Sequence, residues 1–203
     1  VCVIGAGRIG LNHEFDKKRI KPASHVGMWL KNKDCNLVAI CDKDKKQFSK
    51  AKKLKKNLFF YTNPILMLKA VKPKIVSICT WKDSHFQMTK LCIKLGVRVI
   101  VLEKPLANNI KQSKEILKLI KKTKTKVLVN HRRRFDTDII KLKSKLEKGF
   151  LGEIIQVSNY YVYGLLTTAT HAIDTIRFLF SKIAGEIKEV YGFKNNFKNF
   201  TSK

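Results

Sequence analysis

The first ten residues, "VCVIGAGRIG" (1–10), decide which fold the chain can take. The apolar run "VCVI" (1–4) predicts a buried strand, and Gly5, Gly7 and Gly10 follow it with the spacing G-x-G-x-x-G. The first glycine permits a tight turn, the second lets the backbone approach a pyrophosphate, and the third allows a helix to pack closely on the strand. The stretch therefore predicts a dinucleotide-binding turn, with backbone N–H groups and the positive end of a helix facing the phosphates.

The alternation of strands and helices continues to residue 130. Short apolar or aromatic runs of strand length are separated by amphipathic stretches that carry lysines on their outward side. Continuously apolar strands joined by helices indicate a parallel sheet covered on both faces, so residues 1–130 are predicted to form a doubly wound α/β domain of the Rossmann type. The predicted strands are 1–4, 37–41, 58–61, 74–79, 97–102 and 126–130.

The pattern changes at the charged junction "HRRRFD" (131–136). Two helices and two strands that follow are too few to close a core, because a sheet of this size leaves open edges and an uncovered face. Residues 131–203 are therefore predicted to be the N-terminal part of an incomplete α+β domain with an open, mainly antiparallel sheet. This pattern and a start within a strand suggest a truncated sequence. The predicted helices are 137–149 and 171–180, and the predicted strands are 153–164 and 185–193.

The charge balance is strongly basic, with 43 Lys+Arg against 15 Asp+Glu and a formal net charge of +28. Such an excess is typical of proteins that bind nucleic acid or anionic membranes. Here the lysines alternate with apolar residues at helical spacing, which predicts solvated helix faces instead. We therefore expect no nucleic-acid partner.

The cysteines and the apolar runs bear on the redox compartment of the protein and on membrane association. The five cysteines contain no C-x-x-C pair and are odd in number, which favours reduced thiols in a cytoplasmic protein over a disulfide framework. No apolar run reaches the roughly 18 residues that span a bilayer, so we expect no membrane partner.

An acidic residue is expected after the second strand, where its carboxylate holds the ribose hydroxyls of a dinucleotide. Asp42 stands there, farther from the glycine motif than the usual spacing of about 20 residues. The stretch "NHEFDKKRIKPASHVG" (12–27) accounts for the difference as an insertion in the first crossover. A carboxylate at this place repels a 2'-phosphate, so NAD is favoured as cofactor, while Lys43 keeps NADP open.

The run "VIVLEKPLANN" (99–109) is apolar up to the end of a strand and then places an acid, a base and a proline in succession. In open α/β sheets ligands lie outside the carboxyl ends of the strands, so Glu103 and Lys104 are expected at the rim that faces the cofactor. Pro105 restricts the backbone of Lys104 and could accept a cis bond, which would fix the direction of the ammonium group. We predict a functional role for Lys104, against the alternative of a solvated loop lysine.

Taken together, six segments resemble the Gfo/Idh/MocA family, named after glucose-fructose oxidoreductase and inositol dehydrogenase. They are "VIGAGRIG", "LVAICD", "IVSICTWKDSH", "VLEKPLA", "HRRRFD" and "THAIDTIRFL", in the order of the family and across most of the chain. The resemblance implies a Rossmann domain, a C-terminal α+β domain, and oxidation or reduction at a carbon of a sugar, cyclitol or related compound. It also implies a homo-oligomer in the full-length protein, paired through the open sheet.

In this family the signature lysine works beside a histidine, which maps to His171. The aspartate that members carry four residues earlier is replaced by Thr167, which cannot exchange a proton near neutral pH. A helix start disfavours imidazolium, so His171 is predicted to be neutral and able to accept a proton, or else to serve only the helix start. Asp174, three residues on, either orients this ring or has a role in packing or capping.

Further candidates come from the same segments. His85 either lines the cofactor pocket or has a capping role, and Trp81 either lies near the nicotinamide or covers the loop. The arginines at 132–134 either approach substrate or cofactor or form a solvated turn. No partner pattern is evident for His13, His25 and His131, and no metal-ligand spacing occurs. The residues predicted to bind the cofactor are Gly5, Gly7, Arg8, Ile9, Gly10, Asp42, Thr80, Trp81, His85, Glu103 and Lys104.

These residues predict an NAD(P)-dependent oxidoreductase with Lys104 and His171 on either side of a substrate alcohol. His171 would take the hydroxyl proton, Lys104 would stabilise charge on the oxygen, and the nicotinamide would receive the hydride. One rival is a cofactor-binding sensor or degenerate homologue without turnover, motivated by Thr167 and the incomplete second domain. The other is a nucleic-acid-binding protein, motivated by the charge alone.

Overall fold

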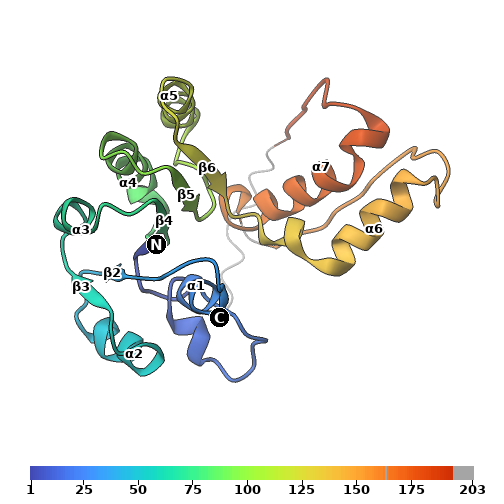
Figure 1. The fold of residues 1–203 in the computed structure, drawn as a ribbon. Coiled ribbons are helices and arrows are strands. Elements are labelled where there is room, and N and C mark those ends of the chain that lie inside the picture. Colours follow the sequence, from blue (N-terminus) through green and yellow to red (C-terminus); the bar gives the residue numbers. More distant parts are fainter. Residues whose placement is uncertain (163, 194–203) are drawn as a thin grey trace, which may run out of the picture.

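The fold is centred on one sheet of six parallel strands in the order β3-β2-β1-β4-β5-β6, seen in a computed structural model that describes residues 1–162 and 164–193 (Figure 1). This order and direction confirm the predicted doubly wound α/β domain. The strands are β1 Cys2–Ile4, β2 Ala39–Cys41, β3 Phe59–Tyr61, β4 Ile75–Ile78, β5 Val99–Leu102 and β6 Lys126–Val129. The α-helices are α1 His25–Lys31, α2 Lys46–Leu54, α3 Pro64–Val71, α4 Lys82–Lys94, α5 Ile110–Lys121, α6 Thr137–Glu147 and α7 Thr170–Ala184, and the shorter turns are η1 Asn12–Phe15, η2 Arg132–Phe135 and the π-helical η3 Leu165–Ala169.

Each face of the sheet carries its own helices, because successive side chains of a strand point to opposite faces. Val76 and Ile78 of β4 belong to the cluster that packs under α3, α4 and α5, together with buried residues of β1, β2 and β5. Val3 and Ile40 belong to the opposite cluster, under α1 and α2. The two layers of helices enclose the strands as Figure 1 shows, so ligands can approach the sheet at its ends.

The first crossover is interrupted directly after the glycine motif. The predicted helix does not begin there, because α1 starts at His25, where the Ser24 hydroxyl accepts a hydrogen bond from the Gly27 N–H group at 3.0 Å. The backbone N–H groups of His25 and Val26 donate to the carbonyls of Ile9 (3.1 Å) and Gly10 (3.0 Å). α1 therefore continues the helical turn that follows the glycine motif, and residues 12–24 loop out between the two parts as an insertion.

A part-buried carboxylate, that of Glu14, fixes this insertion. One carboxylate oxygen of Glu14 accepts hydrogen bonds from the Ala23 N–H (2.9 Å), the Ser24 N–H (3.0 Å) and the Ser24 hydroxyl (2.9 Å). Gly27 leaves room for this carboxylate, since a Cβ atom there would lie 2.0 Å from the same oxygen. The carboxylate thus closes the loop at the start of α1, where negative charge is favourable.

The part of the chain after β6 is helical where it is regular. α6 and α7 pack side by side, apart from the sheet (Figure 1). The strands predicted at 153–164 and 185–193 are wrong for the described residues of these segments, which are irregular; Tyr163 lies outside the described part. Strands need hydrogen-bonding partners, and the two segments do not pair with each other or with the parallel sheet. None of the helices in the described ranges combines the length and apolar character needed to cross a bilayer.

Candidate active site

The glycine turn is tight at two of its glycines and open at the third. Gly5 has φ of +91°, and a Cβ atom there would lie 2.8 Å from the backbone of Cys79. At Gly10 a Cβ atom would lie 2.0 Å from the Gly5 carbonyl oxygen, whereas at Gly7 it would meet no described atom within 4 Å. Arg8 next to it is exposed. This is the arrangement that lets a pyrophosphate approach the backbone at the second glycine.

Asp42 lies beside this turn, directly after β2. Its carboxylate accepts a hydrogen bond from the Ala6 N–H at 2.6 Å and a second one from the Asp44 N–H at 2.9 Å. The insertion therefore lengthens the chain between the motif and the acid without separating them in space. The carboxylate is placed where a ribose hydroxyl of a bound dinucleotide can donate to it.

The loop after β4 and the first turn of α4 bring Thr80, Trp81 and His85 to the same edge of the sheet. Trp81 has 80% of its surface exposed, so its ring is accessible to a ligand. His85 is 1% exposed, and its ring nitrogens lie 2.7 Å from the Pro105 carbonyl oxygen and 3.0 Å from the Thr80 carbonyl oxygen. The structure thus places His85 between two loops, closer to the structural alternative than to the pocket-lining one.

Glu103 follows β5 and is held from two sides. One of its carboxylate oxygens accepts hydrogen bonds from His25 Nε2 at 2.9 Å and from Asn130 Nδ2 at 2.7 Å. Burial alone would raise the pKa of Glu103, but the hydrogen bonds from His25 and Asn130, together with the Lys104 N–H group, hold the pKa below its ordinary value. A carboxylate therefore persists at this edge, and the oxygen that faces His25 is occupied by protein donors.

Lys104 follows β5, and its charge acts on the pKa of His171, which is carried by α7. The Lys104–Pro105 peptide bond is cis. The pKa of His171 is lowered first by burial and then by the positive charges of Lys104 and Arg133. The neutral imidazole is favoured, as predicted, but for a different reason. Because the π-helical η3 precedes α7, His171 does not stand at a free helix end, and its surroundings replace the helix dipole as the cause.

Of the two roles left open for Asp174, its contacts agree with packing and not with orienting His171. Its carboxylate is bound by Arg134 through Nε and Nη2 at 2.7 to 3.0 Å, and it lies 3.7 Å from His131 Nδ1. The rings of His131 and His171 meet edge to face, with centroids 6.1 Å apart. Asp174 thus ties α7 to the junction at residues 132–135 and sets the place of His171 indirectly. The side chain of Thr167 lies outside the described part of the chain.

The sequence did not predict a role at the site for three residues, namely His25, Asn130 and His131. A signal existed for Asn130, because the parallel register sets Leu102 opposite Val129 and hence Glu103 opposite Asn130. His25 carried no such signal, since the length of the insertion had to be known before its place on the continued helix could be assigned.

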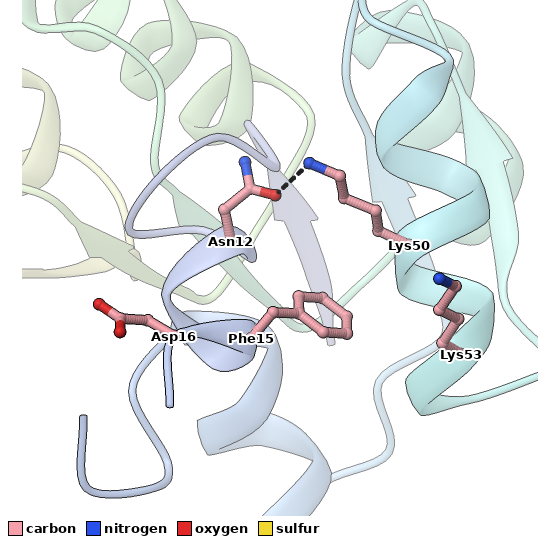
Figure 2. Close-up of a pocket in the computed structure, with 5 residues that line it drawn as sticks. All are labelled: Asn12, Phe15, Asp16, Lys50 and Lys53. Carbon is pink, nitrogen blue, oxygen red and sulfur yellow. Dashed lines mark hydrogen bonds between the residues drawn. The ribbon is translucent and has the colours of Figure 1, made fainter. Parts of the chain in front are cut away.

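A separate hollow lies between η1 and α2, and none of the predicted site residues lines it (Figure 2). Its residues are Asn12, Phe15, Asp16, Lys50 and Lys53, and the Lys50 ammonium donates to the Asn12 amide oxygen at 2.9 Å. No group of three metal-binding side chains is found within residues 1–162 and 164–193.

A parallel sheet with an open glycine turn and an acid after β2 defines a dinucleotide-binding Rossmann domain. The model of the Gfo/Idh/MocA family, described as an oxidoreductase family with an NAD-binding Rossmann fold, matches residues 1–131. The chain belongs to this family, which confirms the resemblance and the nicotinamide cofactor expected of it.

Relatives in the same family carry related names. The chain is 30% identical to D-glucoside 3-dehydrogenase of Escherichia coli over 154 residues, which is 76% of this chain and 40% of that protein. It is 27% identical to myo-inositol 2-dehydrogenase of Thermotoga maritima over 153 residues, which is 75% of this chain and 42% of that protein. The chain therefore spans less than half the length of these relatives.

Solved structures agree on the fold. A myo-inositol 2-dehydrogenase from Lactobacillus plantarum is 26% identical with a TM-score of 0.65, covering 76% of this chain and 42% of that one. A scyllo-inositol dehydrogenase from Lactobacillus casei, solved with NAD(H) and scyllo-inositol, is 19% identical with a TM-score of 0.72, covering 88% of this chain and 55% of that one. At 19% identity the likeness is one of fold.

Proposed function

We propose that the protein transfers a hydride between a nicotinamide cofactor and a carbinol carbon of a sugar, sugar derivative or cyclitol. The observation that carries the proposal is that Lys104, at the carboxyl edge of the sheet, is close enough to His171 for its charge to act on the pKa of that imidazole. The names of the two dehydrogenase relatives support the substrate class, because both name compounds rich in secondary alcohols.

In this proposal the glycine turn and Asp42 hold the cofactor. The open space at Gly7 admits the pyrophosphate, and the carboxylate beside Ala6 accepts from the ribose hydroxyls. NAD is preferred to NADP because a 2'-phosphate would meet the charge of Asp42. Trp81, exposed in the loop after β4, offers a flat apolar surface to a bound ring.

The reacting groups divide the work between a base and a fixed positive charge. His171, held neutral by its surroundings, takes the hydroxyl proton of the substrate alcohol. Lys104 stabilises the negative charge that develops on the oxygen while the carbon–oxygen double bond forms. The bound nicotinamide supplies the hydride acceptor.

Replacing Lys104 tests the proposal in the whole protein. We expect Lys104→Met to lower turnover of NAD⁺ with myo-inositol or a methyl glucoside by about 10³-fold, the size typical of losing a positioned proton-transfer or charge-stabilising group. The affinity for NAD⁺ should change by less than about threefold, since the glycine turn is untouched. Lys118→Met, on the exposed side of α5, is the matched control and should retain activity.

Cofactor binding is measured separately by thermal unfolding. A ligand that binds the native state alone raises the melting temperature, so NAD⁺ should raise it more than NADP⁺ at equal concentration. Binding of NAD⁺ without turnover of any sugar or cyclitol would favour the cofactor-binding sensor. Absence of a shift with either cofactor would refute the proposal as a whole.

A further inference from the structure

Lys104 stands between two residues that are each held by a buried histidine. On one side, His25, which is 4% exposed, donates to the carboxylate of Glu103. On the other side, His85, which is 1% exposed, lies 2.7 Å from the carbonyl oxygen of Pro105. The backbone on both sides of the lysine is therefore tied to the interior of the domain.

The hydrogen bonds around His25 set which of its nitrogens faces Glu103. The Trp29 indole N–H donates to the Ser77 hydroxyl oxygen at 2.7 Å, and that oxygen lies 3.1 Å from His25 Nδ1. Because the Glu103 carboxylate only accepts hydrogen bonds, the ring hydrogen lies on Nε2, and Nδ1 accepts a hydrogen bond from the Ser77 hydroxyl. The chain of donors thus runs from Trp29 through Ser77 and His25 to the carboxylate of Glu103.

The helix that carries His25 reaches this place because of the insertion. The N–H group of His25 donates to the Ile9 carbonyl, as the fourth residue after Ile9 would in an unbroken helix. In the sequence that fourth residue is His13, which lies in the insertion and donates its N–H group to the Arg8 carbonyl instead. A histidine therefore lies four positions after Ile9 both in the sequence, as His13, and along the continued helix, as His25. His25 is the one that is buried against Glu103.

The second histidine joins two loops. His85 is carried by α4, and its two nitrogens face the carbonyl oxygens of Thr80 and Pro105. The loop after β4 and the loop after β5 are thereby fixed relative to each other. Loss of the ring would remove a hydrogen-bond donor that lies between these two part-buried carbonyls.

We propose that His25 and His85 are positioning residues that hold the ammonium group of Lys104 in place, an inference that rests on the proposed function. Neither ring is offered to the substrate, since both have their nitrogens occupied by protein groups. Their effect runs through the backbone of residues 103–105. A reacting group displaced by about 1 Å loses on the order of 10²-fold in rate, so a buried clamp on each side of the lysine has a direct consequence for turnover.

Three variants of the whole protein test His25. His25→Ala should lower kcat about 10²-fold with NAD⁺ affinity within threefold of wild type. His25→Gln, whose amide can still donate to Glu103, should recover at least about tenfold of that loss. His13→Ala is the matched control, because His13 lies in the insertion, and it should leave kcat unchanged. An unaltered kcat in His25→Ala, or equal losses of kcat and NAD⁺ affinity, would overturn the proposal.

His85→Ala should give the same pattern, with kcat reduced and NAD⁺ affinity retained. If the wild-type protein shows no turnover, that result counts against the proposed function and not against the positioning role of His25 and His85. A structural measurement tests the positioning role in that case. In amide ¹H–¹⁵N spectra of the 203-residue chain, His25→Ala and His85→Ala should both shift and broaden the signals of Lys104 and Leu106. His13→Ala should leave both signals in place. Unmoved signals at Lys104 and Leu106 in the two alanine variants would sink the inference.

Discussion

Large apolar side chains are buried in the sheet domain, whereas many are exposed in the part of the chain after the junction at 132–135. In the sheet, Ile78 and Ile100 are completely buried between strands and helices. In the irregular segments after α6 and α7, Ile155, Tyr160 and Phe193 expose 93 to 97% of their surface. Both parts are rich in β-branched and aromatic residues, so composition does not separate them.

The two parts differ in whether their strand-like segments have neighbouring strands to pair with. Every strand of the parallel sheet has a neighbour within residues 1–131, and each of its faces meets helices from the same span. The segments 153–162 and 186–193 have strand-like sequences, but among the described residues they find no strand to pair with. A strand propensity becomes a strand when a neighbour accepts its hydrogen bonds.

Paired core substitutions test this contrast and carry the largest expected effect. Ile100→Ala should lower the free energy of unfolding by about 2–5 kcal/mol, because it opens a cavity in a closed core. Ile155→Ala should change that free energy by less than about 0.5 kcal/mol, because its side chain is already in solvent. Urea unfolding followed by circular dichroism measures both. A loss above about 1 kcal/mol at Ile155 would show that this segment is packed in solution.

The ion pair between Arg134 and Asp174 tests how firmly α7 is joined to the sheet domain. Asp174→Asn removes a charge-assisted pair on a side chain that is 12% exposed, and such hydrogen bonds contribute about 1.5–3 kcal/mol. Hydrogen exchange of the α7 amides should therefore accelerate at least about tenfold, while exchange in β5 stays as in wild type. Glu186→Gln is the control, because its pair with Arg177 on the same helix is exposed and should contribute little. Equal acceleration in β5 would mean that the two parts unfold as one unit.

The sheet domain could be predicted from the sequence because its signals are local. Each predicted strand contains the observed one, and the rule that ligand sites lie at the carboxyl ends of parallel strands placed Asp42 and Glu103 at the correct edge. The acid fell outside the usual spacing, but the insertion at 12–24 accounted for it. Local apolar runs and a simple topology were sufficient here.

The details that escaped prediction all depend on distant partners. The role of His25 required knowing that α1 continues the helical turn at Ile9 and Gly10. Asp174 pairs with a residue 40 positions away, which helical spacing could not reveal. The neutral state of His171 was predicted from a helix end that the π-helical η3 covers, and it follows instead from burial and from neighbouring cations.

The pH dependence of the two parts gives the smallest and most selective effect. The pKa values of His131 and His171 are both lowered from 6.5, first by burial. Folding therefore favours their neutral forms, so the loss of stability begins as the pH falls below about 6.5 and levels off once the pH is below the lowered pKa values. The pKa of Glu103 is also below its ordinary 4.5, but for a carboxylate this means that its stabilising effect persists until the pH falls below about 4.5.

Hydrogen exchange, corrected for the intrinsic rate at each pH, should thus show α7 losing protection between about pH 7 and 5 while β5 loses protection only at lower pH. His131→Gln should weaken the first of these transitions and leave the second unchanged, and a single transition shared by α7 and β5 would contradict the separation of the two parts.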